Sequence, residues 1–422
     1  MSVRTLEVKL NGILVGHLTH YPDERTLFVV DQRYVELGPT RPILSLSMAR
    51  PGDEDGTRQL LQDERFKSSS VKAPPYFSNL LPEGGLRRRI AAELKIHEDR
   101  EFDMLLALGG DLPGAVILAS VDTPDYMRHR RGNLATIPEG RDLPPELRAS
   151  LAGMQFKFSM LRQGERFTFA GAGQQGNFIL KPPSNDFEAL PRLEAATMAV
   201  AKAAGIETPE VALVERSMLD GVEKLSAFRE AEPFYAIRRF DRLEGGGRRH
   251  TEDFAQIFNL RASEKYGQVN YEQIARTLLL YAGGLDDVRE MSRRLVLNVL
   301  IGNGDAHVKN WSLLYEDPRR PRLAPAYDLV STIAYTSNDD SIALNMGKFK
   351  KFKEIGLDTF SYFLQRVGIA DQYRDDVMTA VMAAGNAVLT KWEQIFIEFD
   401  VPPHLIEKVR THVSGLRLGS EL

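Results

Sequence analysis

The chain has 422 residues, of which 43% are hydrophobic, and a formal net charge of −4 at pH 7. This length and apolar content are sufficient for two or three domains with buried cores. The sequence contains no cysteine, which excludes disulfide bonds and thiolate metal sites and is typical of a reducing cytoplasm. The small net charge gives no indication of a chain-wide nucleic-acid-binding surface.

The N-terminal residues lack the apolar core of a secretory signal peptide. A membrane span needs about 20 apolar residues. The best candidate for such a span is interrupted by Asp111 and Pro113. We therefore expect a cytoplasmic protein that does not interact with membranes.

The first residues have the pattern of an antiparallel sheet. Apolar and polar side chains alternate over residues 6–10, which is typical of a strand with one buried face. Asn11-Gly12 is a preferred two-residue hairpin turn, and the apolar stretch 13–18 follows it. These residues predict a β-hairpin, and residues 27–30 predict a third strand.

Two helices and a loop are predicted next. Residues 86–95 and 100–108 have helical patterns, and the second of them stops at a Gly-Gly pair. The first helix carries consecutive arginines at 87–89, which we expect to form a solvent-exposed face. Residues 122–145 are polar and rich in proline, so we expect a linker or an exposed loop there.

The middle of the chain returns to strand-like patterns, and the last part is predicted to be helical. The predicted strands are 156–160, 177–180, 211–214 and 235–237, with one helix from about residue 192 to Gly205. The predicted helices beyond Thr251 are 253–260, 271–281, 286–301, 359–367, 373–396 and 403–416. The expected organisation is a β-rich N-terminal subdomain over 1–135, a mixed β subdomain over 136–245 and a helical lobe over 246–422.

A polar segment that follows a strongly apolar run is the best candidate for a functional site. Asp305 and Asn310 come directly after the apolar residues 295–301, and Asp328 follows further on. A kinase catalytic loop needs an aspartate that receives a hydroxyl proton, together with an asparagine and a second aspartate whose oxygens bind Mg²⁺. Asp305 is therefore the candidate catalytic residue, and Asn310 and Asp328 are the candidate metal ligands. A polar turn after a buried helix would have the same pattern. The residues upstream therefore have to distinguish a kinase catalytic loop from such a turn.

Those upstream residues supply the other parts of a nucleotide site. Small side chains in residues 150–157 let backbone N–H groups approach a phosphate closely, although the same residues also suit an ordinary turn. Lys181 ends a mostly apolar strand and is a candidate partner of the nucleotide phosphates. Glu194, near a helix start, is a candidate to pair with this lysine. The helix dipole alone also favours a glutamate at that position.

His307 favours an alternative interpretation. Asp305, His307 and Asp328 are oxygen and imidazole ligands that suit a metal-dependent hydrolase. The other histidines have no ligand-like spacing, and a hydrolase would leave Lys181 and Asn310 without a role. We therefore prefer the kinase-like site.

Taken together, the motifs of the chain resemble those of the HipA family, the serine/threonine kinase toxins of bacterial toxin–antitoxin modules. The matching segments follow the family's order from about residue 5 to beyond residue 345. They are residues 79–83, 109–116, 150–157, 179–182, 239–242, 252–256 with Lys265 and Tyr266, 304–310 and 327–331. The last seventy or so residues carry no matching motif.

The resemblance implies an α+β fold of the bilobal protein-kinase-like (PI3/4-kinase-like) type, with a β-rich N-terminal subdomain and an all-α C-lobe. It implies a kinase that uses ATP and Mg²⁺ to phosphorylate a serine or threonine of a cellular protein, such as an aminoacyl-tRNA synthetase. The implied partners are a HipB-like helix-turn-helix antitoxin dimer and, mainly through the antitoxin, operator DNA.

The resemblance also implies roles for individual residues. Asp305 would be the catalytic acid–base residue, Asn310 and Asp328 would hold Mg²⁺, and Lys181 would contact the ATP phosphates. Ser150 matches the autophosphorylation site, where a phosphate of roughly −1.5 to −2 charges would expel the phosphate-binding loop and switch the enzyme off. The other residues expected at the nucleotide are Ala152, Gly153, Met154, Gln155, Phe156, Lys157, Arg238, Arg239, Phe240, His307, Lys309 and Tyr327, with Glu194 as a supporting ion pair.

The chain departs from the family pattern at a few positions. Ala306 replaces a glycine, which is tolerated if the backbone does not need a positive φ. Arg238 stands where the best-known member has an acidic residue, in the hinge 238–240; because backbone groups read adenine there, we expect little loss of ATP binding. Met154 and Phe156 replace smaller or polar residues in the phosphate loop, so we expect the autophosphorylation switch to differ.

Two functional hypotheses follow. The first is an active protein serine kinase, because Lys181, Asp305, Asn310 and Asp328 are all present. The second is a pseudokinase-like binding module that acts as a corepressor with a HipB-like antitoxin. Degraded catalytic positions would favour the second hypothesis.

Overall fold

The computed structural model describes residues 3–69, 71–121, 156–170, 174–221, 232–336 and 340–422. The chain folds into two compact units, each formed from several segments of the sequence. The first contains Met1–Ile179, Asp241–Ala262 and Asp317–Arg319, and the second contains Leu180–Phe240, Ser263–Glu316 and Arg320–Leu422. The three-part organisation expected from the sequence stays a prediction.

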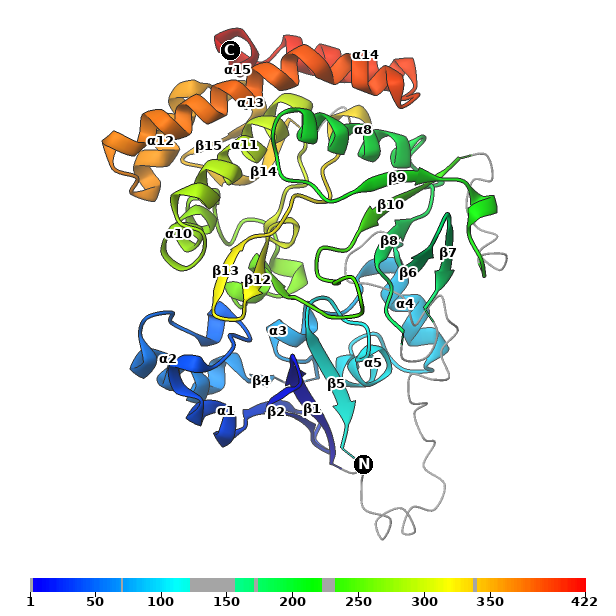
Figure 1. Cartoon of the computed structure of the whole chain (residues 1–422), viewed down its shortest axis with the longest axis vertical. Coiled ribbons are helices and arrows are strands. Elements are labelled where there is room, and N and C mark those ends of the chain that lie inside the picture. The colour runs from blue at the N-terminus through cyan, green and yellow to red at the C-terminus, as the bar shows by residue number, and fades with distance from the viewer. Residues whose placement is uncertain (1–2, 70, 122–155, 171–173, 222–231, 337–339) are drawn as a thin grey trace. The chain divides into compact units, whose positions relative to one another are not determined.

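The N-terminal sheet of the first unit has the strand order β4-β3-β2-β1-β5 (Figure 1). Its first two strands form the predicted hairpin, in which Leu10 pairs with Ile13. The turn residues Asn11 and Gly12 have φ of 49° and 82°, and a turn of this kind matches the twist of the two strands. The strands are β1 (Arg4–Leu10), β2 (Ile13–His20), β3 (Thr26–Val30), β4 (Ser68–Ser69) and β5 (Val116–Ser120).

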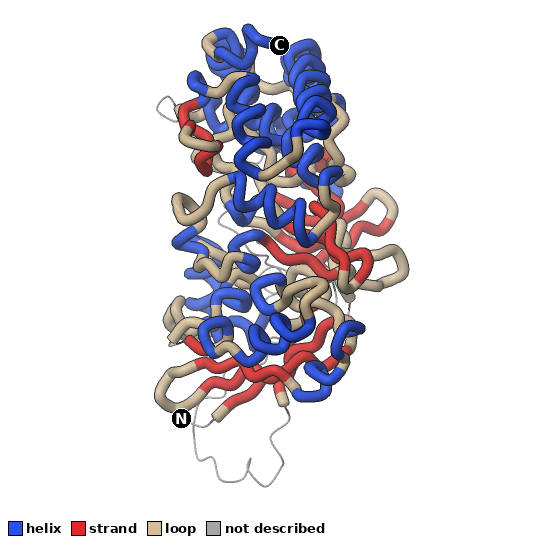
Figure 2. The backbone as a smooth tube through the Cα atoms, turned by 90° about the vertical axis from the view of Figure 1, so that its left-hand side faces the viewer, coloured by secondary structure: helices blue, strands red, loops and turns tan. Residues whose placement is uncertain are grey.

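Helices of the first unit share one hydrophobic core with this sheet, whose strands are red near the N-terminus in Figure 2. Phe77 from α3 and Phe102 from α5 are both buried in this core, and the ring centroids of Phe28 and Phe77 lie 4.9 Å apart. The helices that contribute to this core are α1 (Gln32–Glu36), α2 (Glu54–Gln62), α3 (Pro75–Ser78), α4 (Gly84–Glu93) and α5 (Glu101–Leu108), and the unit also contains α9 (Phe254–Ile257). The remaining strands of the unit are β6 (Phe158–Gln163), β7 (Arg166–Phe169) and β11 (His250–Asp253).

The arginines of α4 behave differently from one another. Arg88 and Arg89 are exposed as predicted. The prediction is wrong for Arg87, because its guanidinium donates to the buried carboxylate of Glu101 at 2.7 Å and to the carbonyl of Glu98 at 2.9 Å. A buried carboxylate needs such a partner. The loop predicted at 122–145 lies outside the described residues.

Two of the matched motifs meet inside the first unit. The N–H of Gly114 donates to Oδ2 of Asp241 at 2.8 Å. The Arg242 guanidinium donates to the carbonyl of Gly114 at 3.0 Å and to Oδ1 of Asp111 at 2.8 Å. Residues 111–114 and 241–242 therefore form a structural junction within this unit.

The second unit begins with three neighbouring strands and one helix. β8 lies next to β10, which pairs antiparallel with β9. These elements agree with the strands and the helix predicted between residues 177 and 237. They are β8 (Phe178–Lys181), α8 (Leu190–Ala203), β9 (Val211–Val214) and β10 (Phe234–Arg238).

Helices make up most of the remainder, as predicted, and lie around the C-terminus in Figure 2. They are α10 (Tyr271–Tyr281), α11 (Leu285–Ile301), α12 (Leu357–Val367), α13 (Asp371–Glu398), α14 (Pro403–Ser414) and α15 (Arg417–Glu421). The prediction of an all-α C-lobe needs correction, because β12 (Ser312–Asp317), β13 (Arg320–Leu323), β14 (Ser341–Met346) and β15 (Phe349–Lys351) also occur there. Such short apolar runs do not distinguish strand from helix by periodicity.

The long helix α13, for which the sequence offered no motif, has a packing role. It packs against α11 and α8, and its buried face includes Val377, Val381, Val388 and Trp392. Because α8 carries Glu194 and α11 leads into the segment with Asp305, α13 supports two parts of the candidate site.

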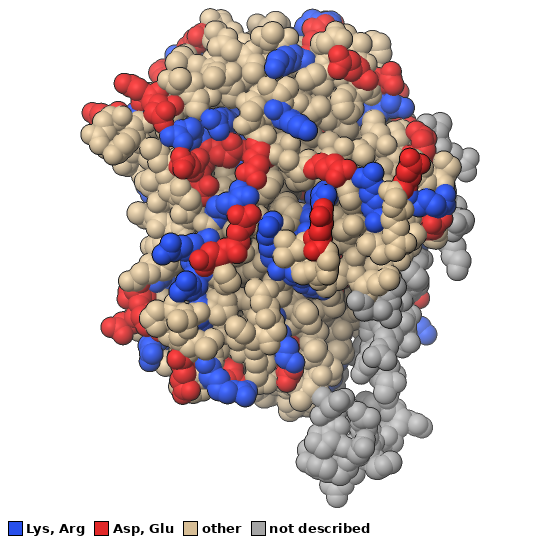
Figure 3. Space-filling model, viewed as in Figure 1, with Lys and Arg blue, Asp and Glu red and all other residues tan. Residues whose placement is uncertain are grey.

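None of the helices in the described part of the chain combines the length and the apolar character that a bilayer span requires. Acidic and basic side chains intermingle on the face shown in Figure 3. This mixture is in line with the small net charge of the chain.

Candidate active site

Lys181 is the residue around which the candidate site is built. It ends β8, and its side chain is 6% exposed. Its Nζ atom lies 2.5 Å from Oε1 of Glu194 on α8 and also forms an ion pair with Oδ1 of Asp328. The second unit thus brings together three charged residues that the sequence analysis assigned to one nucleotide site.

The charges of this cluster support one another. Burial alone would lower the pKa of Lys181, but the charges of Asp328 and Glu194 outweigh burial and raise the pKa above its ordinary value. Lys181 therefore stays charged at neutral pH, and the buried carboxylate of Glu194 keeps a partner. The Nζ atom also lies 5.5 Å from the ring centroid of Tyr235, whose face attracts a cation.

The segment with Asp305 begins where α11 ends. Gly302 ends this helix with φ 68°, and a Cβ added there would lie 2.6 Å from Cγ2 of Ile333. Both the backbone angle and the close approach require glycine at this position. The polar residues 303–310 therefore start at a defined point after the buried helix.

Hydrogen bonds hold the main chain of Asp305 on both sides. Its N–H donates to Oδ1 of the fully buried Asn303 at 3.0 Å. Its carbonyl accepts from the side-chain amide of Asn310 at 2.8 Å and from the N–H of His307 at 2.7 Å. The candidate base and the candidate metal ligand Asn310 are therefore parts of one hydrogen-bonded loop.

A second set of hydrogen bonds joins this loop to the segment that follows Asp328. The Thr332 hydroxyl donates to the carbonyl of Gly302 at 3.1 Å and accepts from the N–H of Gly304 at 2.8 Å. The Ser331 hydroxyl donates to the carbonyl of Ile301 at 2.5 Å. These bonds tie the backbone near Asp305 to the backbone near Asp328.

The donor atoms present suit a magnesium ion. Because the side-chain nitrogen of Asn310 is engaged with Asp305, its Oδ1 is the atom left for a cation. Asp328 supplies carboxylate oxygens, and its side chain is 25% exposed. Amide and carboxylate oxygens are the ligands that Mg²⁺ prefers. The set expected for a hydrolase does not form, since within the described residues no three His, Asp or Glu side chains converge as a metal site would require.

Aromatic and backbone groups lie at the other predicted nucleotide positions. Phe240 follows β10, and its ring centroid lies 5.9 Å from that of Tyr327. The Tyr327 hydroxyl donates to the carbonyl of Lys309 at 3.0 Å. Arg239 is buried, and the N–H of Arg238 donates to the carbonyl of Glu210 at 2.8 Å.

Part of the predicted phosphate loop belongs to the first unit. Phe156 is partly buried against the core of that unit, and Lys157 directly precedes β6. Ser150, Ala152, Gly153, Met154 and Gln155 lie outside the described residues.

The substitution of alanine for glycine at position 306 is compatible with the fold. Ala306 is not among the residues with positive φ, so its methyl group meets no left-handed strain. The condition under which we expect this exchange to be tolerated is therefore met.

Three residues that contact the candidate base or its neighbour Ala306 had no predicted role. They are Asn303, which accepts from the N–H of Asp305, Tyr266, whose hydroxyl donates to Oδ1 of Asp305, and Tyr271, whose hydroxyl donates to the carbonyl of Ala306 at 3.0 Å. Tyr266 lies in a matched motif and Asn303 in the polar segment, so the sequence contained a signal for both residues. Their contacts with Asp305 became apparent only in the tertiary structure.

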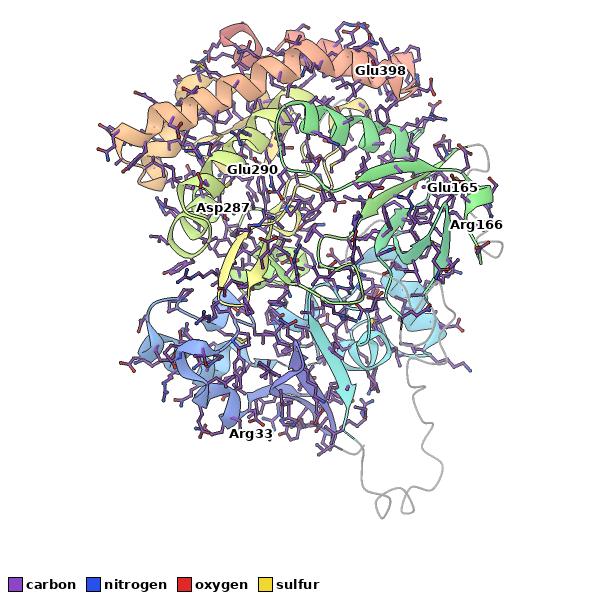
Figure 4. The ribbon with its side chains drawn as sticks, viewed as in Figure 1. Arg33, Glu165, Arg166, Asp287, Glu290 and Glu398 are labelled. Carbon is purple, nitrogen blue, oxygen red and sulfur yellow. The ribbon has the colours of Figure 1, made fainter. Side chains whose placement is uncertain are left out.

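The second unit also contains a cavity of about 510 Å³, which is lined by none of the candidate site residues. Its walls are Gly205, Ile206, Glu207, Asp286, Asp287, Glu290, Arg293, Arg322 and Leu323. Figure 4 labels Asp287 and Glu290, both on α11. Arg322 donates to Glu207 at 2.8 Å, and Asp287 accepts from the N–H groups of Gly283 and Leu323 at 2.8 and 2.7 Å. These charges have partners within the protein, so the cavity gives no indication of a ligand.

Comparisons with known proteins identify the family of the chain. Residues 6–119 match the HipA N-terminal domain, and residues 149–392 match the HipA-like C-terminal domain. The Sinorhizobium fredii protein named "Putative kinase Y4dM" is 36% identical over 100% of this chain and 99% of its own length. The Serine/threonine-protein kinase toxin HipA of Shewanella oneidensis is 24% identical over 81% of this chain and 78% of its own length.

A solved structure has the same fold. It is the complex of HipA, HipB and operator DNA from the Shewanella oneidensis toxin–antitoxin system, and it matches with a TM-score of 0.69 at 20% identity over 97% of this chain and 96% of that chain. This match confirms the predicted α+β fold of the kinase-like type. With both of its domains matched along the sequence, the chain belongs to the HipA family.

Proposed function

We propose that this protein is a serine/threonine-protein kinase that transfers the γ-phosphate of ATP to a serine of a cellular protein. The observation that carries the proposal is the buried ion pair of Lys181 with Glu194, with Asp328 as a second partner. A lysine held by a glutamate beside a metal-binding aspartate is the arrangement that positions nucleotide phosphates in kinases.

Four residues of the candidate site have separate roles in this proposal. Lys181 would bind the ATP phosphates, Asn310 and Asp328 would hold Mg²⁺, and Asp305 would accept the proton of the acceptor hydroxyl. Bound Mg²⁺ would supply the positive charge that neutralises the phosphates. Asp328 is also paired with Lys181, so the same carboxylate would serve both the lysine and the metal ion.

The remaining predicted residues extend the nucleotide site. The backbone of Arg238, Arg239 and Phe240 would form the hinge beside adenine, and residues 152–157 would cover the phosphates. His307, Lys309 and Tyr327 would complete the wall of the site; their place in or beside the hydrogen-bonded loop supports this assignment.

Regulation and partners form a second part of the proposal. Phosphorylation of Ser150 would switch the kinase off, because the added charge would repel the nucleotide phosphates. A HipB-like antitoxin dimer would bind the kinase and connect it to operator DNA as a corepressor, in the cytoplasm. The HipA, HipB and operator DNA complex of the related Shewanella protein supports these partners. An aminoacyl-tRNA synthetase is the class of acceptor protein that we expect.

The direct test is incubation of the purified protein with Mg²⁺ and radiolabelled ATP, followed by mass spectrometry of the labelled peptide. We expect phosphate on Ser150. Asp305→Asn should reduce phosphate incorporation roughly 10²- to 10⁴-fold, because a positioned base contributes about this much. The Asp305 side chain is 51% exposed, so the variant should keep its fold. A protein that neither binds ATP nor incorporates phosphate would contradict the proposal.

The same variant separates the kinase from the binding module. Expression in a bacterial host would show whether the wild-type protein arrests growth. If Asp305→Asn arrested growth to the same extent, toxicity would come from binding and not from phosphoryl transfer. Phosphoproteomics after brief expression of the two proteins would identify the acceptor protein.

A further inference from the structure

A tyrosine outside the predicted site contacts the candidate base. The hydroxyl of Tyr266 donates a hydrogen bond to Oδ1 of Asp305. Nε2 of His307 lies 3.8 Å from the same oxygen. Within the described residues, no hydrogen-bond donor reaches the other carboxylate oxygen, Oδ2. The two oxygens of Asp305 therefore have different surroundings.

Tyr266 is itself held in place. Its ring centroid lies 5.1 Å from that of His307 at an interplanar angle of 75°, and Nζ of Lys265 lies 5.5 Å from the ring centroid. Tyr271, at the start of α10, donates to the carbonyl of Ala306 at 3.0 Å. The segment 265–271 is thus attached to two successive residues of the loop, Asp305 and Ala306.

The hydrogen bonds to the main chain of Asp305 do not fix its side chain. The N–H of Asp305 is bonded to Asn303, and its carbonyl is bonded to His307 and Asn310. These hydrogen bonds involve the main chain of Asp305 alone. The carboxylate is 51% exposed and remains free to rotate about its side-chain bonds without a further partner. The Tyr266 hydroxyl provides that partner, and a hydrogen bond to a charged carboxylate is stronger than one between neutral groups.

We propose that Tyr266 is a positioning residue, which holds Oδ1 of Asp305 and leaves Oδ2 as the oxygen that receives the acceptor proton. This inference rests on the proposed kinase function. In the reaction, the acceptor oxygen forms a bond to the γ-phosphorus while the bond from the γ-phosphorus to the bridging oxygen breaks. ADP leaves with that electron pair, and the acceptor proton passes to Oδ2 of Asp305.

The test is Tyr266→Phe, which removes the hydroxyl and keeps the ring against His307. We expect the maximal rate of autophosphorylation to fall about 10- to 100-fold, because small errors in the orientation of a reacting group cost about this much. The ATP concentration for half-maximal rate should not change. The rates would be measured with radiolabelled ATP at saturating Mg²⁺, and thermal unfolding would verify that the fold is kept.

Tyr373→Phe is the matched control. Tyr373 lies on α13 and is 48% exposed, close to the 46% of Tyr266. Its hydroxyl forms no hydrogen bond with the described residues, so this variant should have the wild-type rate.

Several outcomes would overturn the role of Tyr266. An unchanged maximal rate would show that its hydroxyl does not position Asp305, and a faster rate would show that it competes with the acceptor. A lower melting temperature with a higher half-saturating ATP concentration would show a structural role instead. If the wild-type protein transfers no phosphate, the proposed function fails and this inference fails with it. If the wild-type protein is active and Tyr266→Phe is equally active, only this inference is rejected.

Discussion

Lys181 and Glu194 form a buried ion pair in the second unit, with Nζ and Oε1 2.5 Å apart and side chains that are 6% and 3% exposed. The pair connects the end of a strand to a helix, and Asp328 adds a further negative charge to the same lysine. Because a buried charge without a partner is costly, this arrangement links the stability of the unit to its proposed nucleotide site.

Removal of the lysine charge should therefore affect stability and binding together. Lys181→Met leaves the Glu194 carboxylate buried without its cation, and we expect a loss of about 3–5 kcal/mol in the free energy of unfolding. The double variant Lys181→Met/Glu194→Gln should recover most of that loss, because no buried charge remains. Neither variant should bind Mg-ATP as tightly as the wild-type protein. Urea denaturation measures the stability, and isothermal titration calorimetry measures the binding of Mg-ATP. A Lys181→Met variant as stable as the wild-type protein would contradict the expected cost of the unpaired Glu194 carboxylate.

The Asn310 side chain has two tasks that substitution can separate. Asn310→Ala removes both the proposed Mg²⁺ ligand and the bond to the carbonyl of Asp305. We expect the Mg²⁺ concentration for half-maximal phosphorylation to rise about tenfold or more, since ligands and their orienting groups each contribute about 10- to 100-fold to metal affinity. Asn310→Asp keeps an oxygen ligand and should need less additional Mg²⁺ than the alanine variant. Equal Mg²⁺ requirements in all three proteins would exclude Asn310 as a ligand.

Gly114 should be intolerant of any side chain. Its φ is +73°, and an added Cβ would lie 2.8 Å from the N atom of Thr251. Gly114→Ala combines backbone strain with a clash against the main chain, so we expect a loss of about 2–4 kcal/mol in stability. Gly110→Ala, where an added Cβ meets no atom within 4 Å, is the control and should have little effect. Thermal unfolding of the two variants tests the contrast, which similar melting temperatures would refute.

His250 should make the first unit sensitive to acid. Its Nε2 atom donates to the carbonyl of Leu44 at 2.7 Å, and burial lowers the pKa of this histidine to about 4. In the unfolded chain the pKa is about 6.5, so between these values the unfolded state binds more protons. Stability should therefore decrease as the pH falls from about 6.5 to about 4, by up to about 3 kcal/mol.

His250→Gln keeps a donor for the Leu44 carbonyl and removes the titration. The free energy of unfolding of this variant, measured by denaturation at several pH values, should depend less on pH in that range than that of the wild-type protein. Parallel pH profiles for the two proteins would show that His250 makes no contribution.

Local features of the fold were predictable because neighbouring residues decide them. Asn11-Gly12 specified the first hairpin, and the apolar periodicity of residues 271–281 specified α10 to the residue. The short strands β12 to β15 were not predicted, because runs of three to six residues carry too little periodicity. Arg87 was placed on an exposed face, since nothing near it in the sequence indicated its contact with Glu101.

For the candidate site, the sequence supplied the chemical groups. Spacing and residue type were enough to name Lys181, Glu194, Asp305, Asn310 and Asp328, because kinase chemistry requires a cation, a base and oxygen ligands. The contact of the Tyr266 hydroxyl with Asp305 was not predictable, because the two residues lie 39 positions apart. Their approach depends on how α10 and α11 pack.

The amino-acid sequence by itself determined the hairpin, most helices, the family and the residue types of the site, since each depends on local pattern or on ordered motifs. Only the tertiary structure decided which charges meet. Lys181 and Asp328 are separated by 147 positions and form an ion pair, and Gly114 and Asp241 are separated by 127 and share a buried hydrogen bond. Contacts over such separations follow from the burial of cores and the pairing of buried polar groups, which no local stretch of sequence specifies.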